Sequence, residues 1–112
     1  MNIQRLYAHV CCSDLERSKV WFAKLFDRQP DAAPMDGLVE WYHGPSAGLQ
    51  LFRAPEHAGH SHMTVVLEDL EGERSRLKGE GLEVGEVEPA DSFSLLILRD
   101  PDQNMIVLTQ PL

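Results

Sequence analysis

The two halves of this 112-residue chain carry the same sequence features in the same order. Residues 6–16 read LYAHVCCSDLE and residues 61–71 read SHMTVVLEDLE, and the shared Asp-Leu-Glu triplets begin at Asp14 and Asp69. Each copy has an alternating run, an acidic residue suited to begin a helix, and then a helical stretch. Because repeats determine architecture, we predict one domain, residues 1–112, built from two similar modules over residues 1–55 and 56–112.

The first half contains the signals of a strand, a helix, a loop or edge strand, and two further strands. Alternation over residues 3–12 predicts a strand, and Asp14 or Ser13 can cap the helix that follows, which runs to about Phe26. Residues 29–37 carry two prolines and two aspartates and read as a loop or an edge strand. The remaining strands are predicted over residues 38–43 and 49–53.

The second half repeats this order. Residues 61–67 form the alternating run, Asp69 caps a helix, and the Gly-Glu-Gly sequence at residues 79–81 ends it. Residues 100–104 (Asp-Pro-Asp-Gln-Asn) have the composition of a turn. Further strands are predicted over residues 82–87, 93–99 and 105–110. Each module therefore reads β-α-β-β-β, which places the chain in the α+β class.

Composition excludes several classes of partner. Eighteen acidic residues against ten basic ones give a net charge of −8, which disfavours nucleic acid and anionic membrane surfaces. No apolar run approaches the ~20 residues needed to cross a bilayer, and the N-terminus has no signal-peptide pattern. Adjacent residues of a strand point to opposite faces, so Cys11 and Cys12 are expected to be free thiols, as in a reducing compartment. We therefore expect a cytoplasmic protein.

Strand alternation assigns a core face and a polar face to the first strand of each module. In the first strand the even positions Leu6, Ala8 and Val10 are apolar, whereas the odd positions are Tyr7, His9 and Cys11. In the fifth strand the parity reverses: Met63, Val65 and Leu67 form the apolar face, and His60, His62 and Thr64 share the other. We infer that Tyr7, His9, His60 and His62 point toward one concave surface.

Three segments resemble the vicinal oxygen chelate superfamily, which includes glyoxalase I, bleomycin-resistance proteins, fosfomycin-resistance enzymes and extradiol dioxygenases. They are residues 8–22 (a strand, Ser-Asp-Leu-Glu-Arg-Ser, then Trp-Phe), residues 62–70, and residues 100–104, where the family usually has Gly in place of Gln103. The resemblance covers the whole chain. It implies two βαβββ modules whose curved mixed sheets surround a concave cavity, and it implies a homodimer.

The resemblance also implies four metal-ligand positions, one in the first and one in the last strand of each module. They fall on Tyr7 and Gln50 in the first module and on His62 and Val107 in the second. Tyrosine is a rare ligand and valine has no donor atom, so the set departs from the His, Gln or Glu that metal-dependent members use. If a divalent metal binds, His9 can substitute, which gives His9, Gln50 and His62; otherwise His9 and His62 are hydrogen-bonded cavity histidines.

Other candidate chemistries have a weaker basis. The tract from His57 to His62 contains three histidines, which suits either zinc binding or an exposed linker between the modules. Cys11 is expected to line the cavity. Trp41, paired with Phe52 on the next strand, suits either stacking on a planar ligand or ordinary sheet packing.

These observations favour a small dimeric protein of the bleomycin-resistance type that binds a small organic ligand without a permanent metal. The alternative is a metal-dependent lyase, isomerase or dioxygenase that uses His62. A metal-free enzyme with His9 or His62 as general base also stays open, so the sequence does not decide whether the protein is an enzyme. The predicted cavity residues are Tyr7, His9, Trp41, Gln50, Phe52, His62 and Val107.

Overall fold

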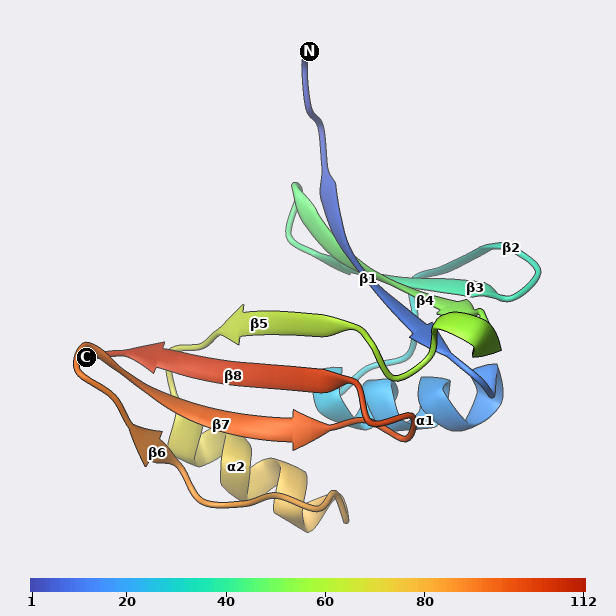
Figure 1. Cartoon of the computed structure of the whole chain (residues 1–112). Coiled ribbons are helices and arrows are strands. Elements are labelled where there is room, and N and C mark those ends of the chain that lie inside the picture. Colours follow the sequence, from blue (N-terminus) through green and yellow to red (C-terminus); the bar gives the residue numbers. More distant parts are fainter.

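The computed structural model describes all 112 residues as two four-stranded mixed sheets with one helix packed against each (Figure 1). Sheet A has the strand order β1-β4-β3-β2, and sheet B has the matching order β5-β8-β7-β6. This confirms the α+β class and the two βαβββ modules. The first module comprises β1 (Leu6–Cys12), α1 (Leu15–Phe26), β2 (Ala32–Met35), β3 (Leu38–His43) and β4 (Ala47–Arg53). The second comprises β5 (His62–Val66), α2 (Leu70–Gly79), β6 (Glu88–Pro89), β7 (Phe93–Arg99) and β8 (Met105–Pro111), after the short 3₁₀ helix η1 (Pro55–His57).

The two aspartates of the repeat cap the two helices. The side chain of Asp14 accepts a hydrogen bond from the backbone N–H of Arg17, and that of Asp69 accepts one from Gly72. Each carboxylate thus satisfies one of the free N–H groups at a helix start and faces the positive end of the helix dipole. Helix α1 is 12 residues long and α2 is 10 residues long, and neither is long and apolar enough to cross a membrane.

The predicted strand over residues 82–87 does not form, and the only strand in this part of the chain is the two-residue β6. Leu82 is buried, and Val84 and Val87 pack against the core, so the apolar residues are used for packing without a strand ladder. The backbone carbonyl of Gly85 accepts a hydrogen bond from the Arg74 guanidinium instead of from a neighbouring strand. Residues 29–37, in contrast, do contribute the edge strand β2.

One continuous apolar core joins the helix-facing sides of the two sheets. In the first module Phe22 of α1 packs beside Trp41 of β3, with ring centroids 6.2 Å apart. In the second module Leu70 and Leu77 of α2 belong to the same buried cluster. Burial of each large apolar side chain stabilises the fold by roughly 1.5–3 kcal/mol, so this shared core provides much of the stability.

Polar contacts join the modules where β1 ends and β5 begins. The fully buried Asn104 donates from Nδ2 to the carbonyl of Cys11 (3.0 Å) and accepts at Oδ1 from the N–H of Ser61 (2.8 Å). The carboxylate of Asp102 accepts from the N–H of Ser13 at 3.0 Å and also bonds the Ser13 hydroxyl. From this junction β1 and β5 diverge, and the N-terminal segment projects away from both sheets (Figure 1).

Candidate functional site

Each sheet has one face covered by a helix and one face that no helix covers, which we call open face A and open face B. Both open faces carry three cross-strand rows, because corresponding strands pair in the same register in the two sheets. The parallel pair β1–β4 corresponds to β5–β8, and the antiparallel pair β3–β4 corresponds to β7–β8. On open face A the rows are Tyr7–Gly48–Tyr42, His9–Gln50–Glu40 and Cys11–Phe52–Leu38. The corresponding rows on open face B are His62–Met105–Arg99, Thr64–Val107–Ile97 and Val66–Thr109–Leu95.

The central row of open face A is a hydrogen-bonded chain. Gln50 Nε2 donates to Glu40 Oε2 at 2.8 Å, and Gln50 Oε1 lies 3.2 Å from His9 Nδ1. Glu40 is only 7% exposed although it is a carboxylate. Since a buried charge needs hydrogen-bond donors, the amide of Gln50 holds Glu40 on one side and fixes the His9 ring on the other.

The neighbouring row of open face A is aromatic. The rings of Tyr7 and Tyr42 lie on either side of Gly48, with centroids 6.5 Å apart and planes inclined at 59°. The hydroxyl of Tyr42 donates to Glu40 Oε1 at 3.2 Å, which links this row to the central one. Burial and the hydrogen bond to the Glu40 carboxylate raise the pKa of Tyr42, so its hydroxyl stays protonated at neutral pH.

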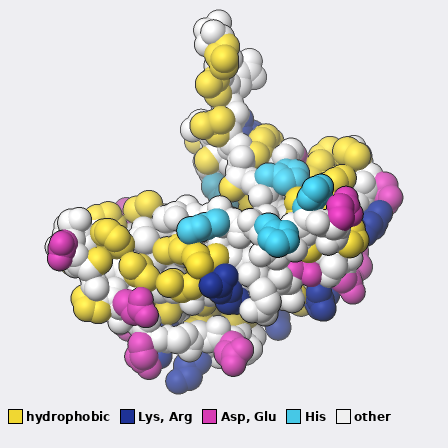
Figure 2. All heavy atoms as spheres, viewed as in Figure 1, with side chains coloured by type: hydrophobic (Ala, Val, Ile, Leu, Met, Phe, Trp, Pro, Cys, Tyr) yellow, Lys and Arg dark blue, Asp and Glu magenta, His cyan; other side chains and the backbone are white.

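Open face B has no hydrogen-bonded chain in its central row, where two of the three residues are apolar. Thr64, Val107 and Ile97 occupy the central row, and Ile97 is 42% exposed. Further along the sheet Val66 is 67% exposed. Figure 2 shows hydrophobic side chains gathered on this sheet and histidines along the boundary between the two modules. The two open faces therefore differ in chemistry although their strands match.

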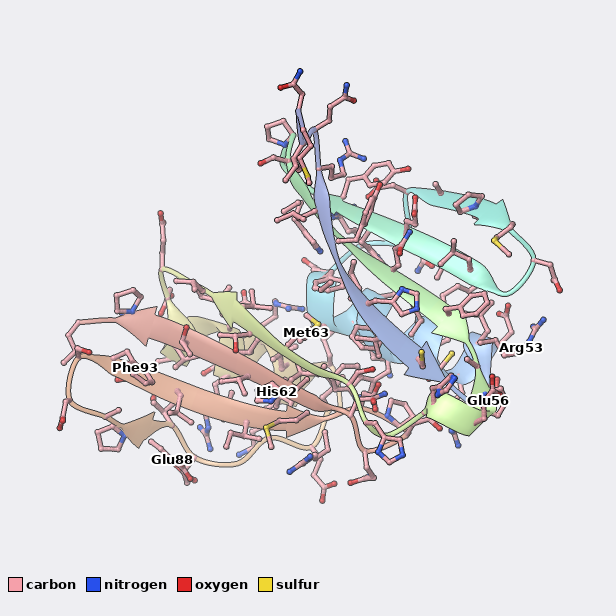
Figure 3. The ribbon with its side chains drawn as sticks, turned by 45° about the horizontal axis from the view of Figure 1, so that its top comes forward. Arg53, Glu56, His62, Met63, Glu88 and Phe93 are labelled. Atoms are coloured by element: carbon pink, nitrogen blue, oxygen red, sulfur yellow. The ribbon has the colours of Figure 1, made fainter.

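Most predicted cavity residues lie on the open faces, but they are divided between the two sheets. Tyr7, His9, Gln50 and Phe52 lie on open face A, and the ring centroids of His9 and Phe52 are 6.0 Å apart. His62 and Val107 lie on open face B, where His62 is exposed at the start of β5 (Figure 3). The ligand role of these residues remains a prediction.

The predicted position of Trp41 is wrong, because its side chain faces α1. Trp41 is completely buried, packs against Phe26 at 5.5 Å between centroids, and donates its indole N–H to the carbonyl of Arg28. The alternate positions of β3 face the other way, so sequence reasoning missed Glu40 and Tyr42 on open face A. The available signal was a glutamate inside an apolar strand, which needs a polar partner on its own face.

The fold has clear relatives among solved structures. A glyoxalase/bleomycin resistance protein from Catenulispora acidiphila DSM 44928 matches with 27% identity and a TM-score of 0.88, covering 96% of this chain and 97% of that one. TnmS3, an antibiotic binding protein from Streptomyces sp. CB03234, has 22% identity and a TM-score of 0.83 over 100% of this chain and 97% of its own. A lactoylglutathione lyase from Agrobacterium tumefaciens has 16% identity and a TM-score of 0.77, covering 94% of this chain and 91% of that one.

The fold is that of the vicinal oxygen chelate superfamily. No family model matches the sequence, and no curated protein matches it. The superfamily resemblance inferred from residues 8–22, 62–70 and 100–104 is confirmed by the similarity to these solved structures. At the position where the superfamily usually has Gly, Gln103 adopts the left-handed conformation that favours glycine, with φ of 71°.

In the single chain, the four metal positions that the resemblance implies are divided between the two open faces. Tyr7 and Gln50 lie in different rows of open face A, and Gln50 already bonds His9 and Glu40. His62 and Val107 lie on the other sheet, and Val107 has no donor atom. No group of three or more His, Cys, Asp or Glu side chains is placed to hold a metal ion, and this includes the tract with His57 and His60.

A cavity between the modules is separate from the predicted site. It is a cleft of about 610 Å³ between the diverging strands β1 and β5, closed at its base by the end of α1. Apolar side chains such as Leu6, Leu49 and Met63 line its walls, and Arg28 and Arg76 lie at its polar end. None of the seven predicted cavity residues contributes to it. A ligand on open face A therefore lies on a surface that a single chain leaves open.

The two cysteines are free, and neither is an activated thiol. Burial, together with the nearby carboxylates of Asp102 and Asp100, raises the pKa of Cys12 to about 11. Burial also raises the pKa of Cys11 on open face A. A thiol nucleophile needs a lowered pKa, so Cys11 is suited to line the surface and not to attack a substrate.

Proposed function

We propose that this chain binds a small organic ligand on open face A and holds no resident metal ion. The observation that carries this proposal is the central row of open face A. There both polar atoms of the Gln50 amide are already engaged in hydrogen bonds, Nε2 with Glu40 and Oε1 with His9. At the equivalent position of the second module, Val107 can form an apolar wall for a ligand but has no atom that can coordinate a metal. Three protein donors are the usual minimum for an octahedral or facial metal site, and at the four implied positions Tyr7 is a rare ligand and Val107 has no donor atom, which leaves Gln50 and His62.

The chemistry of open face A suits an organic ligand with both flat and polar parts. Tyr7, Tyr42 and Phe52 provide ring faces and edges, while His9 and Glu40 provide fixed hydrogen-bonding groups beside them. A small number of placed polar groups among aromatic side chains is typical of small-molecule sites. The similarity to TnmS3, which is described as an antibiotic binding protein, supports the same class of function.

A second copy of the chain is the partner that we propose for open face B, as the superfamily resemblance implies. Val66 and Ile97 are 67% and 42% exposed on that face, and Phe93 beside them is 37% exposed. Contiguous exposed apolar surface of this kind marks interfaces. A homodimer that covers open face B also offers a second wall to a ligand on open face A, which one chain leaves uncovered.

The test measures metal content and ligand binding on the same purified protein. We expect no stoichiometric divalent metal by plasma mass spectrometry after incubation with Zn²⁺, Ni²⁺, Mn²⁺ or Fe²⁺ and gel filtration. A thermal-shift screen of planar organic compounds should give ligands whose stabilising effect is lost in Gln50→Ala and kept in Glu71→Gln, a change on the exposed surface of α2.

One result overturns the proposal in favour of the metal-dependent alternative. It is one tightly held divalent ion per chain that EDTA removes and that His62→Ala no longer retains. The metal-dependent lyase, isomerase or dioxygenase would then use His62 with His9 and Gln50, after Gln50 has turned away from Glu40. Ligands that bind Gln50→Ala as well as the unmodified protein would show that the binding surface lies elsewhere.

A further inference from the structure

The N-terminal segment places a cation on the aromatic row of open face A. The guanidinium carbon of Arg5 lies 4.4 Å from the centroid of the Tyr42 ring and 5.9 Å from that of Tyr7. Arg5 Nη1 also donates to the Tyr7 hydroxyl at 3.1 Å. A cation within about 6 Å of an aromatic ring face is attracted by the quadrupole of the ring. Two rings and one hydroxyl therefore surround this guanidinium.

A buried carboxylate lies in the neighbouring row of the same face and accepts a hydrogen bond from one of these tyrosines. Glu40 is 7% exposed, receives hydrogen bonds from Tyr42 and Gln50, and makes no ion pair with any Lys, Arg or His within 4.0 Å. Its charge is nevertheless felt at Arg5, where the hydrogen bond to Tyr7 and the charge of Glu40 both raise the pKa of the guanidinium. Glu40 thus places a negative charge beside the aromatic row, and no cation pairs with it directly.

The shape of this row depends on Gly48. A Cβ atom built on Gly48 would lie 2.8 Å from a carbon of the Tyr7 ring and 2.8 Å from the backbone oxygen of Trp41. The absence of a side chain at this position lets the Tyr7 ring lie close over β4, beside Tyr42. The two rings and the carboxylate consequently form a fixed receptor, whereas Arg5 belongs to the projecting N-terminal segment, whose residues 1–4 are all exposed.

We propose that Tyr7, Tyr42 and Glu40 form a subsite for the cationic group of an organic ligand, and that Arg5 occupies this subsite until the ligand displaces it. The proposal rests on the proposed function and names the chemical class of its ligand: an amidinium, guanidinium or ammonium group attached to an organic body. Arg5 leaves at small cost, because its contacts here are one hydrogen bond and two ring faces. The net charge of −8 attracts such cations to the protein from solution.

The experiment compares benzamidine, a flat organic cation, with benzamide, its neutral analogue, by isothermal titration calorimetry. Arg5→Ala empties the subsite, so we expect it to bind benzamidine about 2- to 30-fold more tightly than the unmodified protein, the range of a cation–π contact. Benzamide should bind both proteins equally weakly. In the Arg5→Ala background, Glu40→Gln should reduce benzamidine affinity at least fivefold, whereas Glu71→Gln, which removes the same charge from α2, should leave it unchanged.

Tyr42→Leu in the Arg5→Ala background is the second variant if Glu40→Gln does not fold, and it should also remove the preference for benzamidine. Equal affinities for benzamidine and benzamide in Arg5→Ala would overturn the cation subsite and leave the proposed ligand-binding function standing. No benzamidine binding to Arg5→Ala would overturn it as well. Failure of the proposed function is recognised by different results: a stoichiometric metal ion, or ligands whose binding is unchanged in Gln50→Ala.

Discussion

Open face A and open face B have the same strand order and register, but their central rows differ in chemistry. The central row is His9–Gln50–Glu40 on one face and Thr64–Val107–Ile97 on the other. On the helix-facing sides the modules remain alike, since each buries leucines and other large apolar residues against one helix. The strand pairing and the core are thus common to both modules, whereas the central rows of the uncovered faces differ: one is polar and hydrogen-bonded, and the other is mostly apolar.

The largest effect is expected from a substitution that introduces a charge into open face B. Ile97→Glu places a carboxylate on the apolar surface that we assign to a second copy, and an unpaired charge is costly to bury. We expect the dimer dissociation constant to rise at least about a hundredfold, equivalent to about 2.8 kcal/mol, by analytical ultracentrifugation. Val20→Glu adds the same charge at an exposed position of α1, and an equal effect there would contradict the assignment.

The middle residues of the first rows, Gly48 and Met105, should respond differently to alanine. Gly48→Ala introduces a methyl group 2.8 Å from both the Tyr7 ring and the Trp41 carbonyl oxygen. Overpacking of this kind should lower the free energy of unfolding by about 2 kcal/mol, measured by urea denaturation. Met105→Ala removes a half-buried side chain and should cost about 1 kcal/mol or less. A smaller loss for Gly48→Ala than for Met105→Ala would show that the Tyr7 ring is free to move away.

Double-mutant cycles sharpen the comparison of the central rows. Gln50 donates to the Glu40 carboxylate at 2.8 Å, so the pair Gln50→Ala and Glu40→Ala should show a coupling energy of about 1.5 kcal/mol in unfolding experiments. The equivalent pair Val107→Ala and Ile97→Ala makes only apolar contact and should couple by about 0.5 kcal/mol or less. Equal coupling energies in the two sheets would mean that the amide–carboxylate bond has no special weight.

The smallest effect concerns pH. Burial and the neighbouring Arg28 lower the pKa of His43 from 6.5. The unfolded chain therefore binds a proton at this residue at higher pH than the folded one, and stability falls as the pH drops below 6.5 and through the lower folded pKa. His43→Gln should flatten the change of urea midpoint between about pH 7 and pH 5. At the equivalent position in the second module, burial raises the pKa of Asp100, so Asp100 does not reproduce this loss.

The sequence predicted the two modules, the helix caps and the faces of β1 and β5, because these follow from local alternation and from the acidic residues Asp14 and Asp69. It did not predict the orientation of β3. Residues 38–43 have large side chains on both faces, and only the packing of Trp41 against Phe22 and Phe26 decides which face meets the helix. Glu40 and Tyr42 were missed for the same reason.

The relation between the two open faces was also beyond the sequence. The angle at which β1 and β5 diverge depends on contacts between distant residues, such as Asn104 with Cys11 and Ser61, which strand alternation does not specify. Strand alternation predicted that Tyr7 and His62 point toward one concave surface, and this is wrong for the single chain, where they lie on the open faces of two separate sheets. The prediction of a strand over residues 82–87 was wrong for a similar reason. Its apolar residues pack against the core, and its backbone does not pair with a neighbouring strand.

The aromatic packing around Trp41 has a practical consequence. Both tryptophans and both tyrosines of the chain, at positions 21, 41, 7 and 42, belong to the first module, and the second contains no fluorophore stronger than Phe93. Ultraviolet emission of the intact protein therefore reports on half of the molecule. A denaturation curve recorded by emission follows the first module, whereas one recorded by amide absorption follows both. Comparing the two curves reveals whether the second module unfolds together with the first.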